Sequence, residues 1–290
     1  MISGLPIERI QINGRTRVAA VIGWPIAHTL SPTMHNAAFS ALGLDWVYIP
    51  FAVKPQELPA AVTATRALGI GGVNATVPHK EALVNLVDEL TPEARAVGAV
   101  NTIIPISNKL VGHNTDVIGF ERTLHRAGFE MNGSTALVIG AGGAARAVVF
   151  ALLRGNARVI LLNRTEERAV ELLKQVEGDA VAGELNSSEI TRWRDQVQLV
   201  VNTTTLGMWP ESASSPWPAE IPFPSHALLS DLVYNPRQTK LVYQALQAGA
   251  RFVDGLWMLV YQGAESFRLW TGQQPDEELM YQAANKQLGG

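Results

Sequence analysis

The segment GVNATVPHK, residues 72–80, has the pattern of a buried strand that ends beside polar groups. Asn74 and Thr76 fall on one face and apolar residues on the other, because successive side chains of a strand point to opposite faces. Pro78 ends the strand, and Lys80 follows it. Two hydrogen-bonding side chains and an ammonium group would therefore share the end of a buried strand.

These residue types suit the reduction of a carbonyl group. The reaction needs a hydride donor and a proton for the oxygen that gains charge; a lysine can supply this proton, and a nearby carboxylate can orient the lysine. Asp116, in GHNTD, is the candidate carboxylate, and Asn101, in GAVNTI, is a candidate neighbour. Each residue alone has an ordinary explanation: Lys80 as a solvated side chain, Asp116 as a helix N-cap and Thr76 as a strand residue.

A second motif lies in TALVIGAGGAARAVV, residues 135–149. Gly140, Gly142 and Ala145 have the G-x-G-x-x-A spacing between an expected strand and an expected helix, which is the context of a dinucleotide-binding turn. Backbone amides and the helix N-terminus can face a pyrophosphate there. The alternative is a tight strand-to-helix turn without a ligand.

The next expected strand, ARVILLN, ends at Asn163 and is followed by Arg164, Thr165 and Arg168. NAD-binding units usually carry an acidic residue about 20 residues after the glycine motif, and this strand end has none. Two guanidinium groups and a hydroxyl suit the 2′-phosphate of NADP. Alternatively, the arginines are solvated residues at a helix start, although the helix dipole disfavours positive charge there. The sequence favours NADP over NAD.

Alternating strand-like and helix-like segments predict an α/β protein whose parallel sheets are covered on both faces. A first unit has expected strands at residues 17–25, 46–53, 72–77, 99–106 and 109–114, the last two as a hairpin, and expected helices at 31–43, 55–69, 80–90 and 91–98. A second unit has expected strands at 135–140, 157–163, 197–204, 226–234 and 251–255, and expected helices at 115–128, 143–155, 165–176 and 237–249.

Three further features complete the predicted fold: a helix cap, a loop and two C-terminal helices. Ser31 is the expected N-cap of the helix at 31–43, with Pro32 at its first position. The proline-rich segment 208–225 is expected to be a surface loop. Two final helices, at 255–272 and 276–288, have no strand after them, so they could pack on either unit.

The overall composition excludes several classes of protein. A chain of 290 residues suits one large domain or two ordinary ones, and its net charge of −3 gives no basic surface for nucleic acid. No apolar run reaches the length of a membrane span, and the N-terminal segment 1–17 lacks a signal-peptide layout. The chain has no cysteine, which excludes disulfides and thiolate metal sites. We expect a cytoplasmic protein without a bound metal.

Seven motifs in order over nearly the whole chain resemble the shikimate dehydrogenase family: AHTLSPTMHNAAF, GVNATVPHK, GAVNT, GHNTD, GAGGAAR, NRT and YQGAESF. The resemblance implies an NADP-dependent enzyme of aromatic amino-acid biosynthesis that interconverts 3-dehydroshikimate and shikimate, with these small molecules as its partners and a monomer or homodimer as its state. It implies an α/β substrate-binding domain at residues 1–115, a Rossmann-like doubly wound NADP-binding domain at 116–254 and C-terminal helices at 255–290 that return to the first domain.

The resemblance also implies roles for individual residues. The catalytic residues would be Lys80 and Asp116. The substrate carboxylate would bind Thr29 and Ser31, and the rest of the substrate would contact Asn74, Thr76, Lys80, Asn101, Asp116, Tyr234 and Gln262. The cofactor would contact Gly140, Ala141, Gly142, Gly143, Ala144, Asn163, Arg164, Thr165, Arg168, Thr203, Val233 and Gly255.

Two other functions are compatible with the same fold. One is a catabolic quinate/shikimate dehydrogenase, which an acidic residue at position 163 or 164 would have favoured. The other is a non-enzymatic regulator that binds the metabolite and should have lost Lys80 or Asp116; both residues are present.

Overall fold

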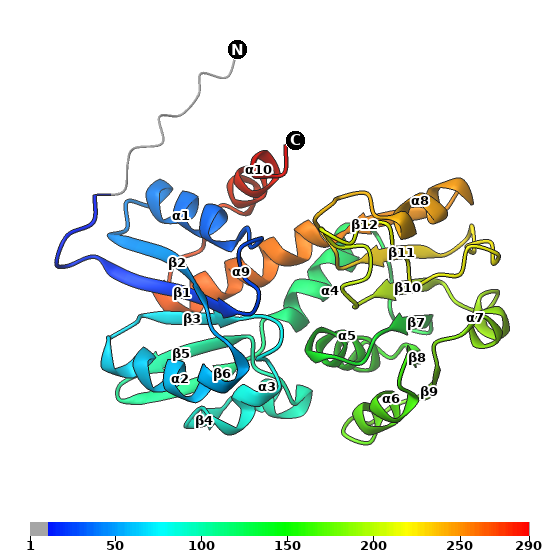
Figure 1. The fold of residues 1–290 in the computed structure, drawn as a ribbon, viewed down its shortest axis with the longest axis horizontal. Coiled ribbons are helices and arrows are strands. Elements are labelled where there is room, and N and C mark those ends of the chain that lie inside the picture. The colour runs from blue at the N-terminus through cyan, green and yellow to red at the C-terminus, as the bar shows by residue number, and fades with distance from the viewer. Residues whose placement is uncertain (1–10, 290) are drawn as a thin grey trace, which may run out of the picture.

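The computed structural model describes residues 11–289, which form two six-stranded sheets with helices packed around them (Figure 1). Most of the segment 1–17, for which we expect no signal peptide, lies outside the described residues. Within the described residues, no helix has both the length and the apolar character that crossing a membrane requires. The α/β fold class is confirmed.

The first sheet has the strand order β2-β1-β3-β5-β6-β4. Its strands are β1 (Arg17–Gly23), β2 (Trp46–Ala52), β3 (Gly72–Ala75), β4 (Glu89–Leu90), β5 (Thr102–Ile106) and β6 (Lys109–His113). Strand β1 runs parallel to β2 and β3, whereas β5 runs antiparallel to both β3 and β6. The predicted hairpin is confirmed, because the two-residue connection between β5 and β6 can join only antiparallel strands. The prediction of a parallel sheet is wrong here, since β5 also runs antiparallel to β3.

The helices of this half are α1 (Ser31–Ala41), α2 (Leu58–Ala67) and α3 (Pro92–Val97). Ser31 is the first residue of α1 and Leu30 its N-cap, without a side-chain cap, so the N-cap prediction is wrong. The helix predicted at 80–90 is also wrong: the segment forms one 3₁₀ turn, Ala82–Asn85, and then β4. Pairing of β4 with β6, and a 2.6 Å hydrogen bond from Leu110 N to the Asp88 carboxylate, replace the helix.

The second sheet is parallel throughout, in the order β12-β11-β10-β7-β8-β9. Its strands are β7 (Thr135–Ile139), β8 (Arg158–Asn163), β9 (Ala180–Glu184), β10 (Leu199–Asn202), β11 (Leu228–Asp231) and β12 (Arg251–Asp254). Its helices include α4 (Asp116–Arg126), α5 (Gly143–Arg154), α6 (Glu166–Leu173), α7 (Ser187–Trp193) and α8 (Lys240–Gln247). The parallel prediction is confirmed for this sheet, although β9 and α7 were not predicted.

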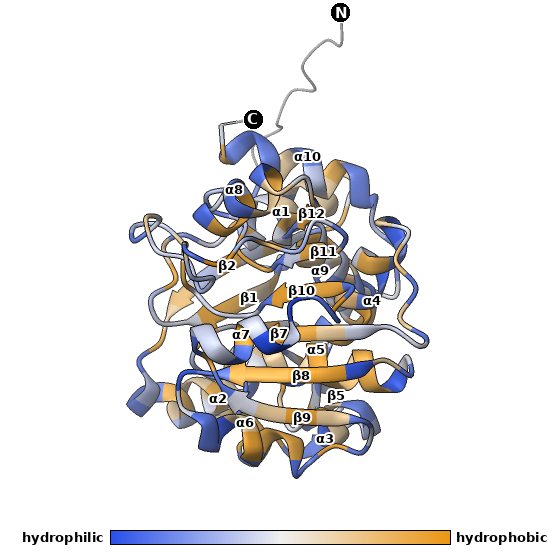
Figure 2. Ribbon diagram, turned by 90° about the vertical axis from the view of Figure 1, so that its right-hand side faces the viewer, coloured by the Kyte–Doolittle hydropathy of each residue, from blue (hydrophilic) through white to orange (hydrophobic). Residues whose placement is uncertain are grey.

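Hydrophobic residues fill the centre of this sheet, and β8 is mainly hydrophobic in Figure 2. Helices on both faces bury such strands, which explains their continuous apolar runs. The proline-rich segment 208–225 forms no helix or strand, as predicted. It is not entirely at the surface, however, because Trp217 is buried against Phe223 and donates a 2.8 Å hydrogen bond to Ile221 O.

The last two helices are α9 (Gly255–Thr271) and α10 (Glu277–Gln287). Helix α9 packs along α4 and also contacts α1 and β5, while α10 packs on α1 (Figure 1). At Gly119 of α4, an added Cβ would lie 2.9 Å from Gln262 Cβ, so the glycine lets α9 approach closely. This approach carries Gln262 toward the first sheet.

Candidate active site

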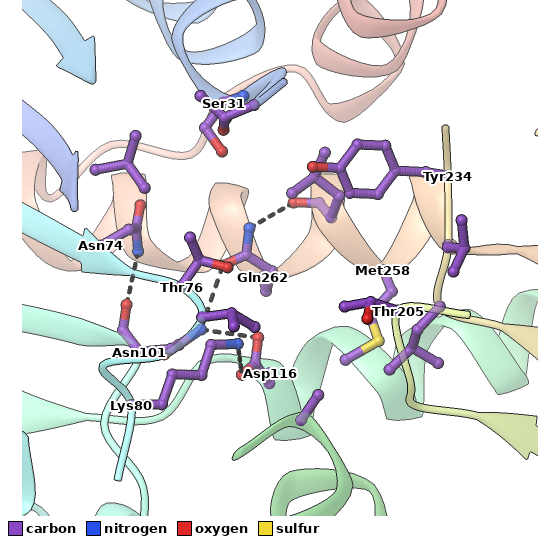
Figure 3. Close-up of a pocket in the computed structure, with 18 of the residues that line it drawn as sticks. Ser31, Asn74, Thr76, Lys80, Asn101, Asp116, Thr205, Tyr234, Met258 and Gln262 are labelled. Carbon is purple, nitrogen blue, oxygen red and sulfur yellow. Dashed lines mark hydrogen bonds and ion pairs between the residues drawn. The ribbon is translucent and has the colours of Figure 1, made fainter. Parts of the chain in front are cut away.

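A cavity of about 180 Å³ lies between the two sheets. The ends of β1 and β3 and the start of α1 form one wall, and the loops after β10 and β11 form the other. Helix α9 contributes side chains to the same cavity (Figure 3). Ligands of α/β proteins bind beyond the carboxyl ends of such strands.

Lys80 and Asp116 form a largely buried ion pair in this cavity. Lys80 Nζ donates to Asp116 Oδ2 at 2.6 Å, and only 14% and 6% of the two side chains are exposed. Asp116 is the first residue of α4, with Thr115 as the N-cap; it is therefore not an N-cap itself. The helix dipole still favours its negative charge at this position. A charged lysine held at a cavity wall can give a proton to a bound oxygen atom.

Asn101 holds the other oxygen of this carboxylate. Its Nδ2 donates to Asp116 Oδ1 at 2.9 Å, and its Oδ1 accepts a 2.7 Å hydrogen bond from Thr115 N. A longer contact of 3.3 Å joins Asn101 Nδ2 to Gln262 Oε1. Both carboxylate oxygens of Asp116 thus have donors, so its orientation toward Lys80 is fixed.

Asn74 lines the same cavity, but its amide group is directed largely inward. Asn74 Oδ1 accepts a 2.8 Å hydrogen bond from the hydroxyl of Tyr48, and Asn74 Nδ2 lies 2.9 Å from Ser266 Oγ and 3.0 Å from Thr102 Oγ1. Because these interior groups already occupy its amide, Asn74 is better placed to hold β3 against α9 than to bind a ligand directly.

The start of α1 supplies hydroxyl groups to the opposite side. Thr29 and Ser31 both line the cavity, and Ser31 N donates to Thr29 Oγ1 at 3.3 Å. The N-terminus of α1 favours an anion beside these hydroxyls. Tyr234, from the loop after β11, also lines this cavity (Figure 3). Burial raises the pKa of Tyr234 to about 12, so its hydroxyl stays protonated at neutral pH.

The glycine-rich turn lies where the second sheet meets Lys80. Gly140 has φ +107°, and an added Cβ there would lie 2.6 Å from Thr203 Oγ1, so both its conformation and its surroundings require glycine. A Cβ on Gly143 would lie 2.9 Å from Lys80 Cβ. The first turn of α5 therefore packs against the aliphatic part of the lysine, while Gly142 faces open space. This arrangement leaves backbone amides free to face a phosphate group.

The strand end predicted to select the cofactor lies beside this turn, because β8 is the parallel neighbour of β7. Arg164 and Arg168 are exposed, and neither forms an ion pair with any residue in 11–289. Asn163 Nδ2 donates to Thr165 O at 2.8 Å, which shapes the turn into α6. Two unpaired guanidinium groups remain available for an anion.

The predicted site residues thus fall into two groups. The cavity is lined by every residue predicted to bind the substrate and, from the cofactor set, by Ala144, Thr203, Val233 and Gly255. The other cofactor residues lie outside the cavity, on the turn after β7 and the turn after β8: Gly140, Ala141, Gly142, Gly143, Asn163, Arg164, Thr165 and Arg168. Their contacts with ligands stay predictions.

Sequence reasoning missed several residues that line the cavity: His28, Thr204, Thr205, Met208, Met258 and Leu259. The threonines follow β10 at the carboxyl edge of a parallel sheet, and that position could have identified them. Met258 precedes Gln262 by four residues and so lies on the same face of α9. His28 precedes Thr29, and burial lowers its pKa.

Three family models match the chain. The shikimate dehydrogenase substrate-binding domain matches residues 21–103, the shikimate/quinate 5-dehydrogenase model matches 97–206, and the shikimate 5′-dehydrogenase C-terminal domain matches 255–284. A shikimate dehydrogenase (NADP(+)) of Thermococcus kodakarensis is 46% identical, and the alignment covers 94% of this chain and 97% of the relative. A protein of the same name from Moorella thermoacetica is 44% identical over 97% of this chain and 96% of its own.

The fold also matches solved structures. Shikimate 5-dehydrogenase of Thermus thermophilus, in complex with NADP(H) and shikimate, has a TM-score of 0.84 and 40% identity, covering 93% of this chain and 99% of that one. A parallel sheet of the dinucleotide-binding type that faces a lysine–aspartate pair is an arrangement typical of nicotinamide-nucleotide oxidoreductases. The chain belongs to the shikimate dehydrogenase family.

Proposed function

We propose that this chain is an NADP-dependent shikimate dehydrogenase that reversibly reduces 3-dehydroshikimate to shikimate in aromatic amino-acid biosynthesis. The observation that carries the proposal is the Lys80–Asp116 pair, 2.6 Å apart, in a cavity whose far wall is built from the loops of a dinucleotide-type sheet. The relatives of 41–46% identity that bear the NADP(+) name support the same reaction.

Each wall of the cavity has a task in this reaction. Thr29 and Ser31 bind the substrate carboxylate beside the N-terminus of α1. The substrate hydroxyl groups contact Thr76, Asn101, Asp116, Tyr234 and Gln262. The carbonyl oxygen faces Lys80, whose ammonium group donates the proton that this oxygen needs when the carbonyl is reduced. In the reverse direction the neutral amine accepts the proton, and Asp116 stabilises the ammonium ion that forms.

The turn after β7 and the turn after β8 fit NADP. Gly140 and Gly143 leave room where a side chain would collide, and the start of α5 offers backbone amides to the pyrophosphate. Arg164 and Arg168 bind the 2′-phosphate in this proposal, and Thr165 follows Arg164 in the same turn; the exposure of both guanidinium groups supports the assignment. When bound, the reduced cofactor supplies the hydride that the carbonyl carbon accepts.

The proposed domain boundaries separate the residues that bind the substrate from those that bind the cofactor. Residues 1–115 form the substrate-binding domain, residues 116–254 the NADP-binding domain, and residues 255–290 the helices that return to the first domain. Packing of α10 on α1, and contacts of α9 with α1 and β5, support this division, while α9 also packs along α4 of the NADP-binding domain. We further propose that the protein works in the cytoplasm as a monomer or homodimer, with small metabolites as its partners.

The test compares substrates and cofactors with one protein preparation. NADP reduction is measured with shikimate and with quinate, each also with NAD, and NADPH oxidation is measured with 3-dehydroshikimate. The proposal predicts turnover with shikimate and NADP. A preference for quinate with NAD would instead identify the catabolic enzyme, and metabolite binding without turnover of any pair would identify a regulator.

A further inference from the structure

Two fully buried polar side chains end the neighbouring strands β10 and β11. Asn202 and Asp231 are register partners, and Asn202 Nδ2 donates to Asp231 Oδ1 at 2.9 Å. Both have 0% exposure, and neither lines the cavity. Buried polar atoms require hydrogen-bond partners, and the remaining partners of this pair lie in the two loops that do line the cavity.

Asn202 fixes the loop after β10. Its Oδ1 accepts hydrogen bonds from Thr204 N at 3.0 Å and from Thr204 Oγ1 at 2.7 Å. Thr204 Oγ1 in turn accepts a 3.2 Å hydrogen bond from Leu206 N. This loop supplies four residues to the cavity wall: Thr203, Thr204, Thr205 and Met208.

Asp231 fixes the loop after β11 in the same way. Its Oδ1 also accepts from Val233 N at 3.1 Å, and its Oδ2 accepts from Thr239 Oγ1 at 2.6 Å. The Thr239 hydroxyl accepts a hydrogen bond from Val242 N and so caps α8. This second loop supplies Leu232, Val233 and Tyr234 to the cavity wall.

We infer that Asn202 and Asp231 are positioning residues for hydride transfer, because their hydrogen bond fixes the separation of the two loops that face the reacting atoms. The inference rests on the proposed function, in which Val233 contacts the cofactor and Tyr234 the substrate. The pair acts only through these loops and touches neither ligand. The hydroxyls of Thr29 and Ser31 belong to the opposite wall and do not depend on it.

Replacing Asn202 by alanine removes the bond to Asp231 and both bonds from Thr204. Reacting groups misplaced by about 1 Å can lose roughly 100-fold in rate, so Asn202→Ala should lower kcat with shikimate and NADP by about 10- to 100-fold. KM for shikimate should change much less, because the carboxylate site is intact. Both constants are measured well below the unfolding temperature of each variant.

Two further comparisons separate positioning from general loss of stability. Leu229 is buried on β11 and packs in the core, so Leu229→Ala should lower the unfolding temperature while leaving kcat near the wild-type value. Thr239→Val removes the hydroxyl that binds Asp231 and should lower kcat, and Thr239→Ser, which restores that hydroxyl, should recover it.

The results that would contradict the positioning role differ from the result that would contradict the proposed function. Either a wild-type kcat for Asn202→Ala or an equal loss of kcat for Leu229→Ala would show that the pair contributes only to stability. An inactive wild-type protein with shikimate and NADP would instead contradict the proposed function.

Discussion

Replacing Lys80 by methionine removes the ammonium group and keeps an unbranched side chain of similar volume. In the wild type, Lys80 Nζ lies 2.6 Å from Asp116 Oδ2 at the cavity wall, where it can protonate a bound oxygen atom. Loss of a general acid lowers kcat by about 10²–10⁴-fold, which corresponds to roughly 3–5 kcal/mol of added barrier. Binding of NADPH should change little, because the ammonium group faces the substrate.

The same change leaves Asp116 without its cation. Removing one partner of a buried ion pair costs about 3–5 kcal/mol when the other charge stays unpaired. Asp116 keeps the 2.9 Å bond from Asn101 Nδ2 and its place at the start of α4. Because Asp116 retains this donor and lines a cavity, its charge is not left wholly without a partner, so we expect Lys80→Met to lower the free energy of unfolding by about 1–3 kcal/mol, at or below the lower end of that range.

Steady-state rates with shikimate and NADP, together with urea unfolding curves, measure the two effects separately. Adding Asp116→Asn to Lys80→Met removes the unpaired charge, so the double variant should recover stability and remain inactive. A Lys80→Met protein that keeps kcat within about tenfold of wild type would contradict the reasoning, since general acid catalysis contributes at least ~10²-fold. Recovery of kcat by the double variant would trace the loss to the fold.

Three other changes test separate parts of the site. Arg164→Ala with Arg168→Ala should lower the ratio of kcat/KM for NADP over NAD by at least about tenfold, because each charge-assisted bond to the 2′-phosphate contributes roughly 1.5–3 kcal/mol; an unchanged ratio at fixed ionic strength would contradict the phosphate site. Ser31→Ala should raise KM for shikimate by about 10- to 150-fold, whereas a lower melting temperature alone would leave Ser31 a structural role. Burial lowers the pKa of His35 from 6.5 to about 3. Below pH 6.5 the unfolded chain therefore gains a proton that the folded protein excludes, and stability should fall by about 1.4 kcal/mol per pH unit until the pH nears the folded pKa. His35→Phe should flatten this dependence in urea unfolding curves, because phenylalanine does not titrate. The replacement breaks no hydrogen bond, since neither ring nitrogen of His35 has a partner within residues 11–289. An equally steep curve for the variant would assign the dependence to other groups.

The motifs predicted correctly from the sequence are those formed by residues close together in the chain. The glycine turn after β7 and the arginines after β8 each depend on one strand and the helix that follows it. The 3.6-residue and 2-residue periodicities therefore placed them correctly. Lys80 and Asp116 lie 36 positions apart, so periodicity could not bring them together. The chemistry of carbonyl reduction made Asp116 a candidate partner of Lys80, and the resemblance to a family implied the same pair.

The errors come from tertiary contacts that local patterns do not contain. Residues 80–90 have helical spacing, but their pairing with β6 gives a 3₁₀ turn and a strand. Strand β9 was missed because its residues are mostly half-buried at the sheet edge, which weakens the apolar signal. Helix α7 was missed although Asn186 caps it by accepting from Glu189 N; its seven residues are too few for a clear period.

The mixed direction of the first sheet explains why its polar residues meet. In an all-parallel sheet, the residue that precedes a strand lies at the opposite edge from the residue that follows one. Because β5 runs antiparallel to β3, Asn101 immediately before β5 lies at the same edge as Thr76 immediately after β3. Strand β6 then returns antiparallel to β5, with Thr102 opposite His113, and brings Asp116 to this edge as well. The antiparallel direction of β5 against β3 therefore places Asn101 beside Lys80, and the hairpin of β5 and β6 then places Asp116 there.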